Sequence, residues 1–185
     1  MILDLIYFIK KKFYICLTNQ INNKKMEFNF LALLAAVAAN LVIGFVWYNP
    51  KVFGTAWLRE TGINVDTDKK PNMIKVFGGH IVYAFFMAIL LQFLVIHQTG
   101  AFGMVGGMPE KALPSYAAFM NDYGSAFRTF KHGALHGAMA GLFFAFPLFG
   151  ITALYEGKSF KYVLITGGYW IVSLAVMGGI ICCWK

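Results

Sequence analysis

The chain contains 185 residues, of which 59% are hydrophobic and only 13% are charged. An average soluble domain has about 45–50% apolar and about 25% charged residues, so this composition excludes a disordered chain and leaves too few charges to cover a soluble globule. The net charge of +8 comes from basic residues scattered along the sequence. Because they do not form one patch, we expect no nucleic-acid partner. The length allows a single domain.

The distribution of charge indicates a membrane protein whose main partner is the lipid bilayer. A spanning helix needs roughly 20 apolar residues to cross about 30 Å of hydrocarbon. Four stretches of at least that length contain no Asp, Glu, Lys or Arg: Phe28–Pro50, Val76–Pro109, His132–Tyr155 and Tyr162–Trp184. The sequence therefore predicts an all-α fold, a four-helix transmembrane bundle with one or two short interfacial helices. We expect the spans at about residues 30–48, 75–97, 133–155 and 162–184.

Residues 1–25 differ from the rest of the chain, because they are rich in Ile, Lys and Asn and contain no Gly, Ala or Pro. Their lysines at 10–12 follow an apolar patch, which is the reverse of the order in a secretory signal. Two explanations are open for this N-terminal extension. It is an amphipathic helix held at the interface by its lysines, or the natural chain starts at Met26, which we favour. Residues 26–185 form the four-span membrane domain in both cases.

An aromatic turn follows the first predicted span. The residue before a proline disfavours the helical conformation, so Asn49-Pro50 ends the helix. Aromatic side chains settle at the level of the lipid headgroups, and we expect Val52–Arg59 to form a short helix in that interface. The interfacial aromatic turn consists of Trp47, Tyr48, Pro50, Phe53 and Trp57.

The region between the second and third spans divides into two parts. Thr99–Pro114 is rich in Gly and Pro, which predicts a loop despite its low charge. Ser115–Lys131 has aromatic residues spaced by three and four with polar residues between them. This pattern predicts an amphipathic helix on the membrane surface.

The third span begins with three glycines at intervals of four residues, Gly133, Gly137 and Gly141. Small residues at this spacing allow the backbone of another helix to approach closely. We expect them to pack helices together and to support a homo-oligomer. Pro147 is expected to kink the second half of the same span.

Motifs at both ends of the domain resemble one family. The opening motif is Gly44-x-x-Trp47-Tyr48-x-Pro50-x-x-Phe53-Gly54-x-x-Trp57, and the closing one includes Glu156-Gly157-Lys158, Gly168-Tyr169-Trp170, Met177-Gly178 and Trp184. They resemble the bacterial membrane family labelled domain of unknown function 1761, over about Glu27–Lys185. The segment Phe130–Gly137 resembles a subgroup of it. The resemblance implies four spans and a multi-pass location in the bacterial cytoplasmic membrane, and it implies no activity.

Histidines are the best candidates for chemistry. His132 and His136 are four residues apart and share a helix face, and His97 ends the second span at the same membrane surface. Three imidazoles placed in this way suit zinc or another transition metal. The alternative is that they bond to backbone or headgroups, and the lack of a nearby Cys or carboxylate favours it, so no cofactor is expected. His80 lies 17 residues before His97, about 25 Å along a helix, and does not join them.

Polar side chains inside the spans suggest a second kind of site, because such groups need partners in the membrane and often have a function. Asn40, Gln92 and His136 would line this possible polar path. Three functions remain open. The first and favoured one is a non-enzymatic structural or accessory membrane component, the second a small-solute transporter or channel along that path, and the third a metal-dependent membrane enzyme.

Overall fold

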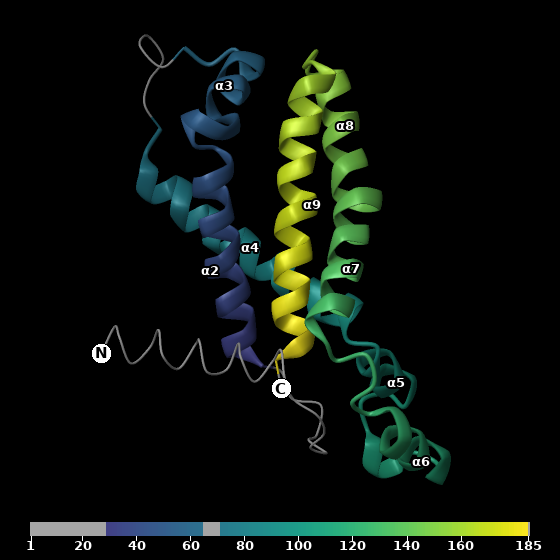
Figure 1. Cartoon of the computed structure of the whole chain (residues 1–185). Coiled ribbons are helices and arrows are strands. Elements are labelled where there is room, and N and C mark those ends of the chain that lie inside the picture. The colour runs from purple at the N-terminus through teal and green to yellow at the C-terminus, as the bar shows by residue number, and fades with distance from the viewer. Residues whose placement is uncertain (1–28, 65–70, 185) are drawn as a thin grey trace, which may run out of the picture.

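The computed structural model describes residues 29–64 and 71–184, and within these ranges the protein is helical and contains no strand (Figure 1). Four helices are long and apolar enough to cross a membrane: α2 (Phe30–Trp47), α4 (Met73–Val95), the helix over Phe130–Tyr155, and α9 (Phe160–Cys183). The prediction of an all-α, four-helix fold is confirmed. The predicted extension of residues 1–25 lies outside the described residues.

Each spanning helix begins at a short polar residue whose side chain accepts a hydrogen bond from the first turn. Asn29 caps α2, Asn72 caps α4, Thr129 caps the third span and Ser159 caps α9. Such caps satisfy backbone N–H groups that have no partner within the helix. They explain why the second, third and fourth spans begin two to three residues before the predicted positions.

α9 is the central helix of the bundle. It packs against α2, α4 and both halves of the third span, and Figure 1 shows it between α2 on one side and α7–α8 on the other. Most of its side chains are buried, whereas most of those in the other three spans are half-buried or exposed. The outward faces are largely apolar, and large exposed apolar areas are typical of membrane or protein contacts. The fully buried core includes Leu33, Leu91, Met177 and Ile181.

The third span is continuous but changes its winding in the middle. It consists of α7 (Phe130–Ala140), the π-helical turn η3 (Gly141–Ala145) and α8 (Phe146–Tyr155). Pro147 has no N–H to donate and would clash with the carbonyl four residues earlier in a regular helix. The N–H of Phe146 instead donates to Gly141, five residues back. The wider turn directly before Pro147 thus accommodates the proline.

The aromatic turn after α2 contains the π-helical turn η1 (Pro50–Gly54) and the short helix α3 (Thr55–Thr61). Lys158, in the turn between α8 and α9, donates to the Thr61 carbonyl over 2.7 Å. The Ser159 hydroxyl donates to the Glu60 carboxylate over 2.6 Å. This hydrogen bond, with Lys161 and Arg59 nearby, lowers the pKa of Glu60. α3 is therefore attached to the end of the bundle where α8 turns into α9.

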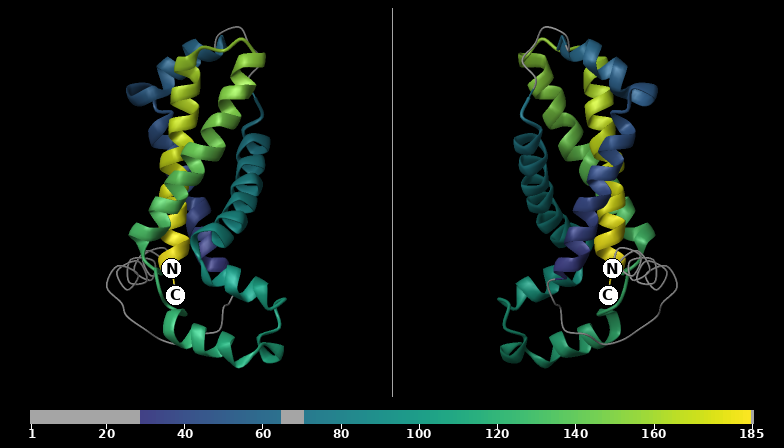
Figure 2. Two further views of the ribbon diagram at one scale, coloured as in Figure 1. Left: turned by 90° about the vertical axis from the view of Figure 1, so that its right-hand side faces the viewer. Right: turned by 90° about the vertical axis from the view of Figure 1, so that its left-hand side faces the viewer.

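At the opposite end the chain leaves the bundle between α4 and α7. We call residues 96–129 the excursion; it contains α5 (Gln98–Met104), the 3-10 turn η2 (Pro109–Lys111) and α6 (Pro114–Tyr123). Figure 2 shows it projecting beyond the ends of the spanning helices.

Two expectations about the excursion were wrong. The predicted loop Thr99–Pro114 is partly helical, because α5 and η2 form within it. The predicted helix Ser115–Lys131 already ends at Tyr123, and a non-helical turn over residues 124–129 separates it from α7. Phe127 adopts a left-handed conformation with φ of 62° in this turn, so the helical aromatic spacing does not continue through it.

Candidate metal centre

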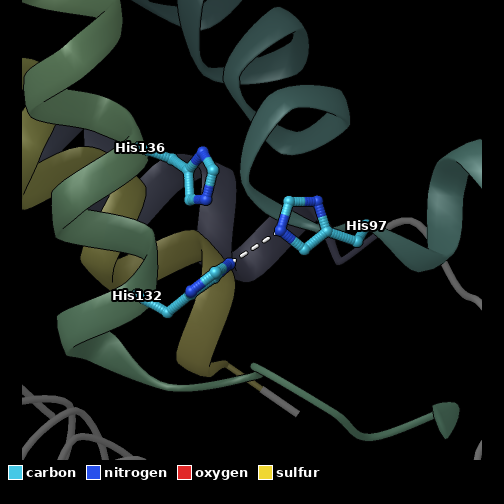
Figure 3. A group of neighbouring side chains, drawn as sticks. All are labelled: His97, His132 and His136. Carbon is cyan, nitrogen blue, oxygen red and sulfur yellow. Dashed lines mark hydrogen bonds between the residues drawn. The ribbon is translucent and has the colours of Figure 1, made fainter.

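Three histidines meet where the excursion joins the bundle. His132 and His136 lie on successive turns of α7, and His97 lies in the short link between α4 and α5. Figure 3 shows the three rings turned toward one another from these two parts of the chain. We call them the histidine triad. The structure thus brings together all three residues that the sequence analysis named for a metal.

The triad is compact enough to coordinate one ion. One ring nitrogen from each histidine lies within 4.8 Å of the others, and Nε2 of His132 is 2.8 Å from Nε2 of His97. Zinc–nitrogen bonds of about 2.0–2.1 Å place the nitrogens of a tetrahedral site about 3.4 Å apart. To form such a site, the shortest nitrogen–nitrogen separation would have to open and the longest to close.

The exposure of the triad leaves a route for an ion from the water. His97 is exposed, and His132 and His136 are half-buried. Among the described residues this group holds three histidines and no cysteine or carboxylate. Three neutral imidazoles therefore supply three ligands, and a fourth position stays open for water or another small ligand.

The N-terminus of α7 is fixed by contacts immediately before the triad. The Thr129 hydroxyl accepts from the His132 N–H over 3.3 Å. The Phe127 ring stacks on the His132 ring, with centroids 5.0 Å apart, and lies edge-on to His97 at 6.1 Å. Sequence reasoning did not connect Phe127 with the histidines, since its position depends on a turn that the aromatic spacing concealed.

The residues of the possible polar path fall into different surroundings. Asn40 is fully buried, and its Oδ1 lies 2.6 Å from Nε2 of His80, which joins α2 to α4. His136 belongs to the triad. Gln92 is buried on α4, twelve residues after His80 and so about 18 Å further along the helix. His80 is thus a partner of Asn40 that the sequence analysis did not identify.

The glycines of the third span face α9 of the same chain. A methyl group on Gly133 would overlap the carbonyl oxygen of Gly178, and one on Gly137 would overlap that of Leu174. A methyl group on Gly141 would likewise overlap the Ile171 backbone. The groove is therefore filled from within the chain, so an oligomer would have to use other surfaces.

The aromatic turn contacts the closing motif of the domain. Trp47 Nε1 donates to the Ile165 carbonyl over 3.0 Å. The Tyr48 ring packs on the Tyr169 ring with centroids 5.2 Å apart, and it also meets Trp57 at 5.3 Å. The two ends of the sequence that carry the family resemblance therefore form one contact between α2 and α9.

Residues 31–182 match the family described as "Protein of unknown function (DUF1761)". The chain belongs to this family. The matched region covers most of the four apolar helices, and the family description assigns no activity. Comparison with curated proteins and with solved structures gives no match. In this DUF1761 member the histidine triad is the candidate functional site.

Proposed function

We propose that this membrane protein binds one divalent transition-metal ion, of the zinc class, at His97, His132 and His136. The observation that carries the proposal is the mutual approach of three imidazole nitrogens to within 4.8 Å. They come from parts of the chain 35 residues apart. A chance surface histidine needs no such partners, whereas a metal site requires them.

The chemistry of the ligands selects the kind of ion. Imidazole suits zinc, copper, nickel and iron, while calcium and magnesium prefer oxygen ligands. The triad offers no oxygen ligand of its own. We therefore expect zinc, cobalt, nickel or copper to bind and magnesium and calcium to be rejected.

The position of the proposed ion suggests what the favoured accessory role would be. An ion held by the triad links the end of α4 to the start of α7 and so closes the excursion at its base. A structural or accessory metal protein, placed in the bacterial cytoplasmic membrane that the family resemblance implies, is the function that we favour. The open fourth ligand position leaves an enzymatic use of the metal as the alternative.

Cobalt titration of the purified protein in detergent tests the proposal, because tetrahedral cobalt absorbs visible light. We expect one cobalt ion per chain, displaced by zinc. The variants His132→Ala and His136→Ala should lose the absorption. The matched control His80→Ala removes a histidine that lies on α4 beside Asn40, and it should bind like the wild type. Absence of binding, or equal binding by His136→Ala, would contradict the proposal.

A further inference from the structure

Phe127 is an unusual residue beside the triad. Within residues 29–64 and 71–184 it is the one non-glycine residue with a positive φ, at 62°. Residues with a Cβ adopt this backbone conformation at a cost in free energy. Such strain persists only where the surrounding structure enforces it. The residue is nevertheless 64% exposed, so its burial does not explain the conformation.

The surroundings of Phe127 enforce the turn from several sides. Gln98, the residue after His97, donates through Nε2 to the carbonyls of Tyr123 and Ala126 over 2.8 and 2.9 Å. Arg128 donates to the carbonyls of Cys182 and Trp184 at the end of α9, over 2.7 and 2.8 Å. The turn is therefore tied both to the residue next to His97 and to the central helix.

The result of these contacts is that the Phe127 ring covers part of the triad. It stacks on the His132 ring with an angle of 29° between the planes and meets His97 edge-on at 81°. A ring in contact with two of the three ligands restricts their rotation. It also places an apolar ring directly beside two ligands that an entering ion has to reach.

We infer that Phe127 acts as a lid on the metal centre, whose ring lies against His132 and His97 and limits the rate at which an ion enters and leaves. This inference rests on the proposed function. The ring has to turn aside before the ion exchanges, in the manner of a small lid over a binding site. The exposed side of the ring gives it room for that movement.

Metal exchange kinetics distinguish this role from ordinary packing. The wild type and Phe127→Ala are loaded with cobalt, and an excess of chelator then removes the ion in a stopped-flow instrument. We expect Phe127→Ala to speed both cobalt uptake and removal about tenfold and to change Kd by less than about threefold, because a lid acts on both rates. Phe127→Tyr, which keeps the ring, should restore the slow exchange.

The control is Phe119→Ala, which removes another exposed aromatic residue of the excursion that packs on Tyr123. Its exchange rates should equal those of the wild type. If Phe127→Ala does not fold, Phe127→Leu replaces it and is expected to exchange faster as well. Exchange by the Phe127 variants at the wild-type rate would overturn the inference while metal binding stands. If the wild type takes up no cobalt, the proposed function fails and this inference fails with it.

Discussion

At the scale of single residues, the glycines of α7 determine how closely α7 and α9 pack. Gly133 and Gly178 face each other across the contact, and neither has room for a methyl group. Lipid tails are as apolar as the side chains, so helices in a membrane gain little from simple apolar burial and depend on such close packing. Replacing one glycine hydrogen with a methyl group is therefore expected to lower the stability of the bundle.

The variant Gly137→Ala tests this contact. The added methyl group would overlap the Leu174 carbonyl oxygen, which belongs to backbone and has little freedom to move. We expect a loss of about 1–3 kcal/mol, the usual cost of overpacking, measured as a lower melting temperature in detergent. Gly150→Ala on α8 is the control, because its methyl group would lie at an ordinary distance of 3.8 Å from Val163. Because alanine favours a helix more than glycine does, an equal loss of stability in the two variants would show that the contact with Leu174 is not responsible.

At the scale of elements, one side chain connects the excursion to the end of α9. The last carbonyls of a helix have no partner within it. The guanidinium of Arg128 donates hydrogen bonds to two of them, the carbonyls of Cys182 and Trp184. Burial lowers the pKa of Arg128, yet an arginine stays charged at any ordinary pH. The contact therefore combines two hydrogen bonds with a cation at the negative end of the helix dipole.

Replacing this side chain should loosen both elements that it joins. Arg128→Met keeps most of the length and removes the donors. Because hydrogen bonds to charged groups contribute about 1.5–3 kcal/mol each, we expect a large drop in melting temperature and faster hydrogen exchange in the last turn of α9. The control Lys131→Met removes an exposed charge three residues away. Unchanged exchange at the end of α9 in Arg128→Met would show that the contact contributes no stability.

The elements also show how far a sequence can be interpreted. Charge-free stretches predicted the four spans, since the cost of a charge in lipid is strong and local. The excursion was harder, because its helices depend on contacts with distant residues. No glycine marks the left-handed residue Phe127, and the hydrogen bonds that stabilise the turn join it to other elements, to α5 through Gln98 and to α9 through Arg128.

In the candidate site, too, local features could be predicted from the sequence, whereas contacts between distant helices could not. The spacing of His132 and His136 on one helix face is a local property, so the sequence predicted it. The approach of His97 to His132 depends instead on how α4 packs beside α7. The pairing of Asn40 with His80 likewise requires the relative position of α2 and α4, which spacing along the chain does not contain.

At the scale of the whole molecule, both ends of the bundle are closed by contacts between segments that are far apart in the sequence. At one end the aromatic turn and α3 are attached to α9 and to the turn before it. At the other end the triad and Arg128 connect α4, α7 and α9. The ends therefore hold together helices whose outward faces are exposed and largely apolar.

An ion at the triad should stabilise the entire chain, because a ligand that binds only the folded state shifts the unfolding equilibrium. At a zinc concentration 100 times Kd the gain is about 2.7 kcal/mol, which for a chain of this size raises the melting temperature by roughly 5–10 °C. A chelator should reverse the shift. His136→Ala should abolish it and His80→Ala should keep it. A shift of the same size in His136→Ala would place the stabilising ion elsewhere, since that variant removes one of three ligands. The comparison thus assigns the stabilisation to the triad itself, separately from any general effect of zinc on the detergent or the surface.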